Sequence, residues 1–168
     1  MSRLSFIFLA AALLITAGCK RSETSSESKT ETEAETKAAA KSETKKLSGG
    51  AVLPLTTAQF KASVMDYEAN PSEWKYLGDK PAVIDFYATW CGPCRSMSPI
   101  IEEAAKRYAG DVVFYKVDID EETELAQLFG IQSIPFFLFI PVQGKPSAQT
   151  GAIDAKGFDK MVREIVKP

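Results

Sequence analysis

The pair Cys91 and Cys94, separated only by Gly92 and Pro93, constrains this chain more than any other feature of its sequence. If the segment after Cys91 is helical, residues three apart lie on one face about 5–6 Å apart, within the Cα separation of a disulfide. Pro93 fits the first turn of a helix, where its missing N–H costs no hydrogen bond. Cys91 would then lie beside unpaired backbone N–H groups and the positive end of the helix dipole, which lower a thiol pKa.

The same placement predicts that the two thiols are not equivalent. Cys91 stands at the helix end, where exposure and the dipole favour the thiolate. Cys94 lies one turn further in and is expected to be more buried. The sequence therefore predicts a thiol pair that cycles between dithiol and disulfide, with Cys91 as the nucleophile and Cys94 as the resolving thiol.

A zinc site and a purely structural disulfide are the less reactive interpretations of this pair. A structural zinc site needs two further cysteine or histidine ligands. The chain has no histidine, and its one other cysteine is Cys19, far away in the N-terminal segment. We therefore expect no metal, while a structural bridge stays an alternative.

Apolar segments on either side of the pair have the composition of buried strands. Pro81–Tyr87 is almost continuously apolar apart from Asp85, and Val112–Val117 is similar. Such segments suit the middle of a sheet that is covered on both faces. Between them, Pro93–Tyr108 has apolar residues at helical spacing, and Pro99 inside it predicts a kink. Strand, helix and strand together predict a parallel βαβ unit.

Further strands and helices complete an α/β sandwich, in which a central mixed sheet is flanked by helices. Before the βαβ unit we expect an edge strand at Ala51–Leu55 and a helix from Thr56 or Thr57 to about Tyr67, which Asn70–Pro71 ends. After it we expect a helix that is capped by Asp120 and runs through Phe129 to Gly130. A strand at Ile134–Ile140, a turn at Gln143–Gly144, an antiparallel strand at Ser147–Ala152 and a last helix capped by Asp154 follow.

Asp85 is the most informative single polar residue because it interrupts an apolar strand. Burial of a carboxylate among Val83, Ile84 and Phe86 is unfavourable unless the group is protonated or partnered, so its pKa should be raised. A carboxyl with a raised pKa near two thiols is a candidate proton acceptor for Cys94. The alternative is a carboxylate turned toward water at a strand edge.

The segments Ala82 to Arg95, Gly130 to Pro135 and Gly144 to Gly151 resemble the thioredoxin family, and the resemblance covers residues 51–168. It implies the thioredoxin fold and a redox disulfide between Cys91 and Cys94. It also implies that Asp85 is the buried aspartate of the family and that Pro135 is a cis-proline facing the disulfide. As a cis-proline it would present the backbone of Ile134 to an extended substrate; a strand-start role for Pro135 is the alternative.

The resemblance further suggests which residues form the substrate groove and which modulate the site. Lys116 is similar to the lysine that neighbours the buried aspartate in thioredoxins, and is a possible modulator. Tyr87 stands where thioredoxins often carry Trp, and Phe136 stands where Thr is usual; both would flank the groove. The groove residues expected on this basis are Trp90, Gly92, Pro93, Ile134 and Phe136.

The N-terminal segment has the layout of a secretory signal. Residues 1–18 contain an apolar run from Leu4 to Ile15, followed by Thr16-Ala-Gly before Cys19. The run is shorter than the stretch of about 20 residues that a transmembrane helix needs. These small residues resemble a bacterial lipobox, which predicts lipidation of Cys19, although Thr16 replaces the usual Leu. Ordinary signal cleavage or an uncleaved anchor are the alternatives. Lipidation would leave only the Cys91–Cys94 pair as free thiols.

Residues 19–50 are expected to be a disordered polar tether, and residues 51–168 a single domain. Lys20 to Gly50 is mostly Ser, Thr, Glu, Lys and Ala, without an aromatic residue, and has too little apolar surface to offset the entropy of ordering. The remaining residues are the right number for one domain with one core. The net charge of −2 and scattered basic residues make nucleic acid a poor candidate partner.

These observations predict a thiol–disulfide oxidoreductase that reduces protein disulfides in the cell envelope, lipid-anchored on the periplasmic side of a membrane. We expect no metal or organic cofactor, a monomer, disulfide-bonded proteins as substrates and a membrane protein as electron donor. Gly92-Pro93 between the cysteines is typical of reducing thioredoxins. A soluble periplasmic form, a disulfide oxidase or isomerase, and a tethered binding module without redox turnover are the alternatives.

Overall fold

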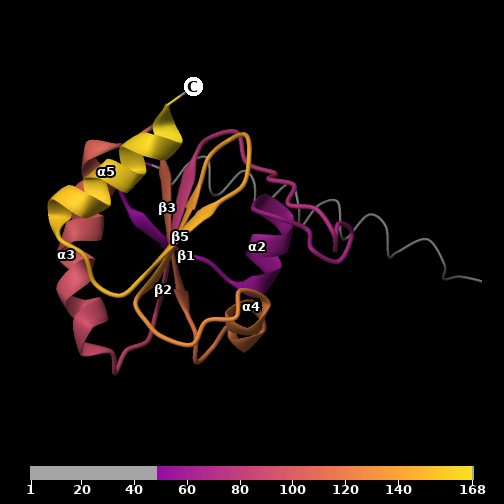
Figure 1. Ribbon diagram of the computed structural model, residues 1–168, viewed down its shortest axis with the longest axis horizontal. Coiled ribbons are helices and arrows are strands. Elements are labelled where there is room, and N and C mark those ends of the chain that lie inside the picture. The colour runs from indigo at the N-terminus through magenta and orange to yellow at the C-terminus, as the bar shows by residue number, and fades with distance from the viewer. Residues whose placement is uncertain (1–48, 168) are drawn as a thin grey trace, which may run out of the picture.

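The computed structural model describes residues 49–167 of the chain, and these form an α/β sandwich (Figure 1). The expected signal sequence, the lipid attachment at Cys19 and nearly all of the expected tether lie outside the described residues. The elements in chain order are β1 (Val52–Pro54), α2 (Thr57–Ser63), β2 (Ala82–Tyr87), α3 (Gly92–Arg107), β3 (Val113–Asp118), α4 (Thr123–Leu128), β4 (Phe136–Ile140), β5 (Ser147–Thr150) and α5 (Ala155–Val166).

The five strands form one mixed sheet in the order β1-β3-β2-β4-β5. β3 lies parallel to both β1 and β2, whereas β4 runs antiparallel to β2 and to β5. The predicted βαβ unit is thus confirmed, and the apolar β2 is the central strand. Pro54 ends β1 at the sheet edge, where its missing N–H removes no ladder bond.

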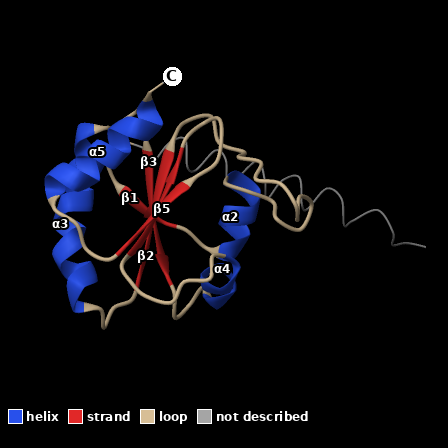
Figure 2. Ribbon diagram, in the orientation of Figure 1, coloured by secondary structure: helices blue, strands red, loops and turns tan. Residues whose placement is uncertain are grey.

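α3 and α5 cover one face of the sheet, and α2 and α4 cover the other (Figure 2). A separate apolar core lies under each pair of helices. Because side chains alternate along a strand, Ile84 and Phe86 of β2 point toward α2 and α4, while Val83 points toward α3 and α5. The first core also contains Phe60 and Leu125, and the second contains Met97, Ile101, Phe158 and Val162.

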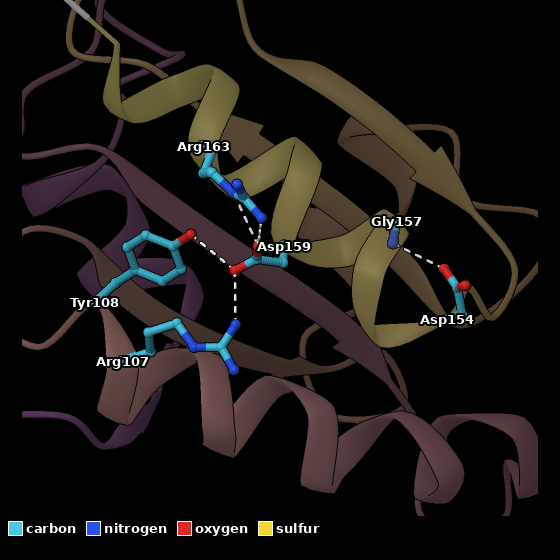
Figure 3. Close-up of polar contacts among 6 residues, drawn as sticks. All are labelled: Arg107, Tyr108, Asp154, Gly157, Asp159 and Arg163. Atoms are coloured by element: carbon cyan, nitrogen blue, oxygen red, sulfur yellow. Dashed lines mark hydrogen bonds and ion pairs between the residues drawn. The ribbon is translucent and has the colours of Figure 1, made fainter.

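A buried carboxylate joins the two helices on the α3 face (Figure 3). Asp159 of α5 accepts hydrogen bonds from the Arg107 guanidinium at 2.9 Å and from the Tyr108 hydroxyl at 2.8 Å. Arg163, one turn further along α5, donates to the other oxygen from Nε at 2.8 Å. These bonds lower the pKa of Asp159 and hold the C-terminal end of α3 against α5.

The first helix is shorter than predicted. Thr56 caps it in a capping box with Gln59, as expected for a threonine at this position, but α2 ends at Ser63 instead of continuing to Tyr67. The carbonyl of Val64 accepts a hydrogen bond from the N–H of Leu77 at 2.9 Å, so a contact with a distant loop replaces the next helical turn.

Two predicted element starts are wrong, and the strand predicted at Ser147–Ala152 ends at Thr150. Glu122, not Asp120, is the N-cap of α4, and its carboxylate accepts from the N–H and hydroxyl of Thr57 instead of capping its own helix. The strand predicted at Ile134–Ile140 begins only at Phe136, so Pro135 lies outside the ladder and removes none of its bonds. Asp154 caps the last helix, as predicted. The predicted turn contains Gly144, whose φ is 95°.

Candidate redox site

The redox site begins where β2 ends and α3 starts. Cys91 is the N-cap of α3, and Pro93 lies in the first turn. A disulfide joins Cys91 to Cys94 with a Cα–Cα distance of 5.3 Å, inside the range that the helical spacing predicts. The backbone N–H of Cys94 donates to the sulfur of Cys91, with 3.1 Å between nitrogen and sulfur. This donor and the positive helix end stabilise negative charge on the Cys91 sulfur when the bond is open.

Exposure does not separate the two cysteines as expected. Cys91 is 4% exposed and Cys94 2% exposed. Ala88, Tyr87 and Ile134 pack around the pair, and this cover buries Cys91 although it stands at a helix end. The difference between the two sulfurs therefore lies in their position relative to the N-terminal backbone N–H groups.

Trp90 is the exposed side chain next to the disulfide, with 65% of its surface accessible. Its indole N–H donates to the carboxylate of Asp120 at 2.8 Å, which explains why Asp120 does not cap α4. No local pattern predicts this hydrogen bond, because the two residues are 30 positions apart in the chain. Gly92 is half-buried and Pro93 exposed, so three of the predicted groove residues are accessible beside the disulfide.

The peptide bond between Ile134 and Pro135 is cis. Pro135 is buried, and its carbonyl accepts a hydrogen bond from Gly151 at 2.8 Å. Ile134 packs against the cluster that contains both cysteines. Phe136 is half-buried with its ring against Phe86, centroids 5.8 Å apart, on the side of the sheet covered by α2 and α4. The structure thus brings the predicted cis-proline segment to the disulfide.

Asp85 is buried in the central strand, as predicted, with 6% of its surface exposed. Its Oδ1 atom has no hydrogen-bond partner among residues 49–167. Burial raises the pKa of this carboxyl to about 7, and the positive charge of Lys116, its register partner on β3, opposes that rise. A carboxyl that titrates near neutrality is suited to accept and return a proton.

Asp85 lies in a cleft of about 340 Å³ between α3 and the sheet. β2 contributes Tyr87 as well as Asp85, and β3 contributes the exposed Lys116. Tyr87 therefore lies on the α3 face, beside the buried carboxyl. The other lining residues, which sequence reasoning did not single out because only the packing of α3 on the sheet brings them there, are Gly50, Ala51, Val52, Ser98, Ile101, Glu102 and Lys106.

Within the described part of the chain, no three histidine, cysteine, aspartate or glutamate side chains are grouped so that they could hold a metal ion. The same residues include no helix that is long and apolar enough to cross a membrane.

A disulfide at the start of a helix that follows the central strand, with a buried carboxyl and a cis-proline, defines a thiol–disulfide oxidoreductase. The thioredoxin family model matches residues 51–164, and the chain belongs to this family. It is 45% identical over 113 residues to a thioredoxin of Borreliella burgdorferi, an alignment that covers 67% of this chain and 96% of the relative.

Other comparisons agree with this assignment. The chain is 48% identical over 80 residues to a thioredoxin of Malassezia sympodialis, which covers 47% of this chain and 76% of that protein. A crystal structure of Malassezia sympodialis thioredoxin superposes with a TM-score of 0.57 at 33% identity, covering 70% of this chain and 93% of the other. The predicted fold and the predicted thiol–disulfide oxidoreductase activity are thereby confirmed.

The buried carboxyl makes stability depend on pH. A rise in pKa from 3.8 to about 7 on folding means that Asp85 destabilises the native state as pH increases between these values, because the unfolded chain ionises first. Well below pH 3.8 the carboxyl is protonated in both states and the penalty vanishes. Above pH 7 it is complete and amounts to about 4 kcal/mol, since each pKa unit corresponds to about 1.4 kcal/mol.

Asp85→Asn should therefore be more stable than the wild type, and the difference in unfolding free energy should widen by about 2–3 kcal/mol between pH 5 and pH 8. Urea denaturation of the oxidised proteins at both pH values measures this. Asp111→Asn removes an exposed carboxyl, and its unfolding free energy should differ from that of the wild type by the same amount at both pH values. Parallel pH dependence of the wild type and Asp85→Asn would show that the carboxyl titrates as it does in water.

Proposed function

We propose that this oxidoreductase reduces protein disulfides in the cell envelope, attached through lipid on Cys19 to the periplasmic side of a membrane. The proposed redox activity rests on the environment of the Cys91 sulfur, which accepts a hydrogen bond from the N–H of Cys94 at the start of α3. The location depends on the sequence alone: a short apolar run in residues 1–18, small residues before Cys19, and a polar segment that follows.

The proposed reaction needs only groups of this chain and the substrate. Cys91 as thiolate attacks one sulfur of a substrate disulfide, and a mixed disulfide forms while the other substrate sulfur leaves as a thiolate. Cys94 gives its proton to Asp85 and attacks the Cys91 sulfur, so the mixed disulfide breaks and the substrate leaves with two reduced sulfurs. The dithiol loses two electrons and becomes the Cys91–Cys94 disulfide. A membrane protein that donates electrons would then reduce the Cys91–Cys94 disulfide again.

The position of Gly50 relative to the disulfide is compatible with an anchored form. Gly50 packs against the C-terminal end of α3, where an added Cβ would lie 3.3 Å from Lys106 Cα and 3.4 Å from Ala109 Cβ. Cys91 caps the opposite end of this 16-residue helix, which is about 24 Å long. A tether that ends at Gly50 would thus leave the disulfide directed away from the point of attachment.

Substrate capture tests the assigned roles of the cysteines. In Cys94→Ser the mixed disulfide forms but is not resolved, so this variant should accumulate covalent complexes with envelope proteins that disappear on reduction. Cys91→Ser should form almost none, because Cys94 lacks the N-cap position of its neighbour. Non-reducing gels of the two variants give the comparison, with the Cys91→Ser/Cys94→Ser double variant as the blank. Equal capture by both single variants would contradict the assigned nucleophile.

The reduction potential of the Cys91–Cys94 pair tests the direction of electron flow. Reductants of this fold lie near about −270 mV and oxidants near about −120 mV, and we expect a value close to the former. Equilibration with glutathione buffers measures the potential, and insulin reduction with the double serine variant as control confirms turnover. A potential near the oxidising end would favour the oxidase, and a wild type no more active than the double variant would favour a binding module.

Cys19→Ser tests the anchor. The variant should move the domain into the soluble periplasmic fraction or leave an unprocessed precursor, because the acceptor sulfur for the lipid is lost. Fractionation followed by mass measurement shows either outcome. The Cys91→Ser/Cys94→Ser variant keeps Cys19 and should stay with the membrane. A Cys19→Ser protein that is membrane-bound at its mature mass would refute lipid attachment.

A further inference from the structure

Tyr87 connects the two parts of the redox site. On one side its ring packs against the cluster of Ala88, Cys91 and Cys94. On the other side it lines the cleft that holds Asp85. Tyr87 and Asp85 are two positions apart on β2, so their side chains leave the same face of the sheet.

The Tyr87 ring also contacts Lys116, whose positive charge lowers the pKa of Asp85. The ammonium nitrogen of Lys116 lies 5.7 Å from the centre of the ring, within the range of a cation–π interaction. Lys116 is exposed on β3, and no carboxylate oxygen lies within 4 Å of its ammonium among residues 49–167. The aromatic ring therefore provides a contact that restricts this long side chain, which in water samples many rotamers.

We propose that Tyr87 is a positioning residue that acts through Lys116: its ring holds the ammonium at the cleft and so favours the ionised form of Asp85. The inference rests on the proposed role of Asp85 as proton acceptor for Cys94. It assigns the aromatic side chain at position 87 a function in proton transfer that is separate from contact with substrate.

Other titratable residues line the same cleft, and their effects must be separated from that of Lys116. α3 contributes Glu102 and Lys106 to the lining of the cleft, and β2 contributes Tyr87 itself. Lys116 is the charged neighbour that lowers the pKa of Asp85, against the larger effect of burial. Cys91 and Cys94 do not titrate while they are joined in the disulfide. A measurement on the oxidised protein therefore reads Asp85 without interference from the thiols.

The test is a double-mutant cycle on the titration of Asp85 in the oxidised full chain, followed by carboxyl carbon NMR. Lys116→Gln removes the charge and should raise the pKa of Asp85. Tyr87→Leu removes the ring but leaves the charge of Lys116. The change that it causes in the pKa of Asp85 should be more positive when Lys116 is present than in the Lys116→Gln background. The cycle is needed because a smaller side chain also admits water to the cleft, which lowers the pKa in both backgrounds.

Aromatic variants serve as matched controls and do not depend on the folding of Tyr87→Leu. Tyr87→Phe keeps the ring and loses the hydroxyl, so the pKa of Asp85 should stay at its wild-type value. Tyr87→Trp offers the strongest cation–π partner and should lower that pKa relative to Tyr87→Phe, but only while Lys116 is present.

The outcomes separate this inference from the proposed function. An effect of Tyr87→Leu that is the same with and without Lys116 would overturn it, as would a Tyr87→Phe shift as large as that of Tyr87→Leu. The pH dependence of insulin reduction is recorded for the same variants. If Asp85 titrates as expected but turnover does not follow its titration, the coupling of Tyr87 to Lys116 stands and the role of Asp85 as proton acceptor fails.

Discussion

The redox site depends on burial of β2 as the central strand of the sheet. β3 pairs with it on one side and β4 on the other, and helices cover both of its faces. A strand in this position has no freedom to shift, because a slip of one residue would turn its apolar side chains to the wrong core. The register therefore fixes Asp85 opposite Lys116 on β3 and opposite Phe137 on β4. It also fixes the point from which the chain turns into Cys91.

This arrangement produces two opposite electrostatic environments within one short segment. The Cys91 sulfur lies at the positive end of α3 and accepts a backbone N–H, so negative charge on it is stabilised. Asp85 has its Oδ1 without a partner in an apolar core, so negative charge on it is destabilised. One short segment thus supplies a sulfur on which negative charge is favoured and a carboxyl that keeps its proton up to about neutral pH, the group to which we assign the proton of Cys94.

Much of the fold was predictable because the signals were local. The apolar character of β2 and β3, the helical spacing within α3 and the Asp154 cap follow from short stretches of sequence, and the structure agrees with them. The burial of Asp85 was predictable for the same reason. The cis bond before Pro135 was not deducible from local pattern alone and came from the resemblance to the family.

The errors arose where a distant partner overrides a local preference. Asp120 has the composition of a helix cap, but the Trp90 indole occupies its carboxylate. The first helix has apolar residues at helical spacing beyond Ser63, but Leu77 takes the Val64 carbonyl. Cys91 stands at a helix end and is nevertheless buried, since Tyr87 and Ile134 cover it. The contact of Tyr87 with Lys116 also depends on residues far apart in the chain, because it joins two strands whose register the local sequence does not predict.

The energetics of Asp85 argue that its presence serves the chemistry. A penalty of about 4 kcal/mol above pH 7 is a large part of the 5–15 kcal/mol that stabilises a typical domain. An asparagine or an apolar residue would avoid it, and the strand around position 85 is otherwise composed of the side chains that such a core prefers. Local violations of the folding rules are expected where a residue has a function. The Asp85 carboxyl, whose Oδ1 has no hydrogen-bond partner among the described residues and whose register partner is Lys116, is such a violation. Proton transfer during resolution is the function that we assign to it.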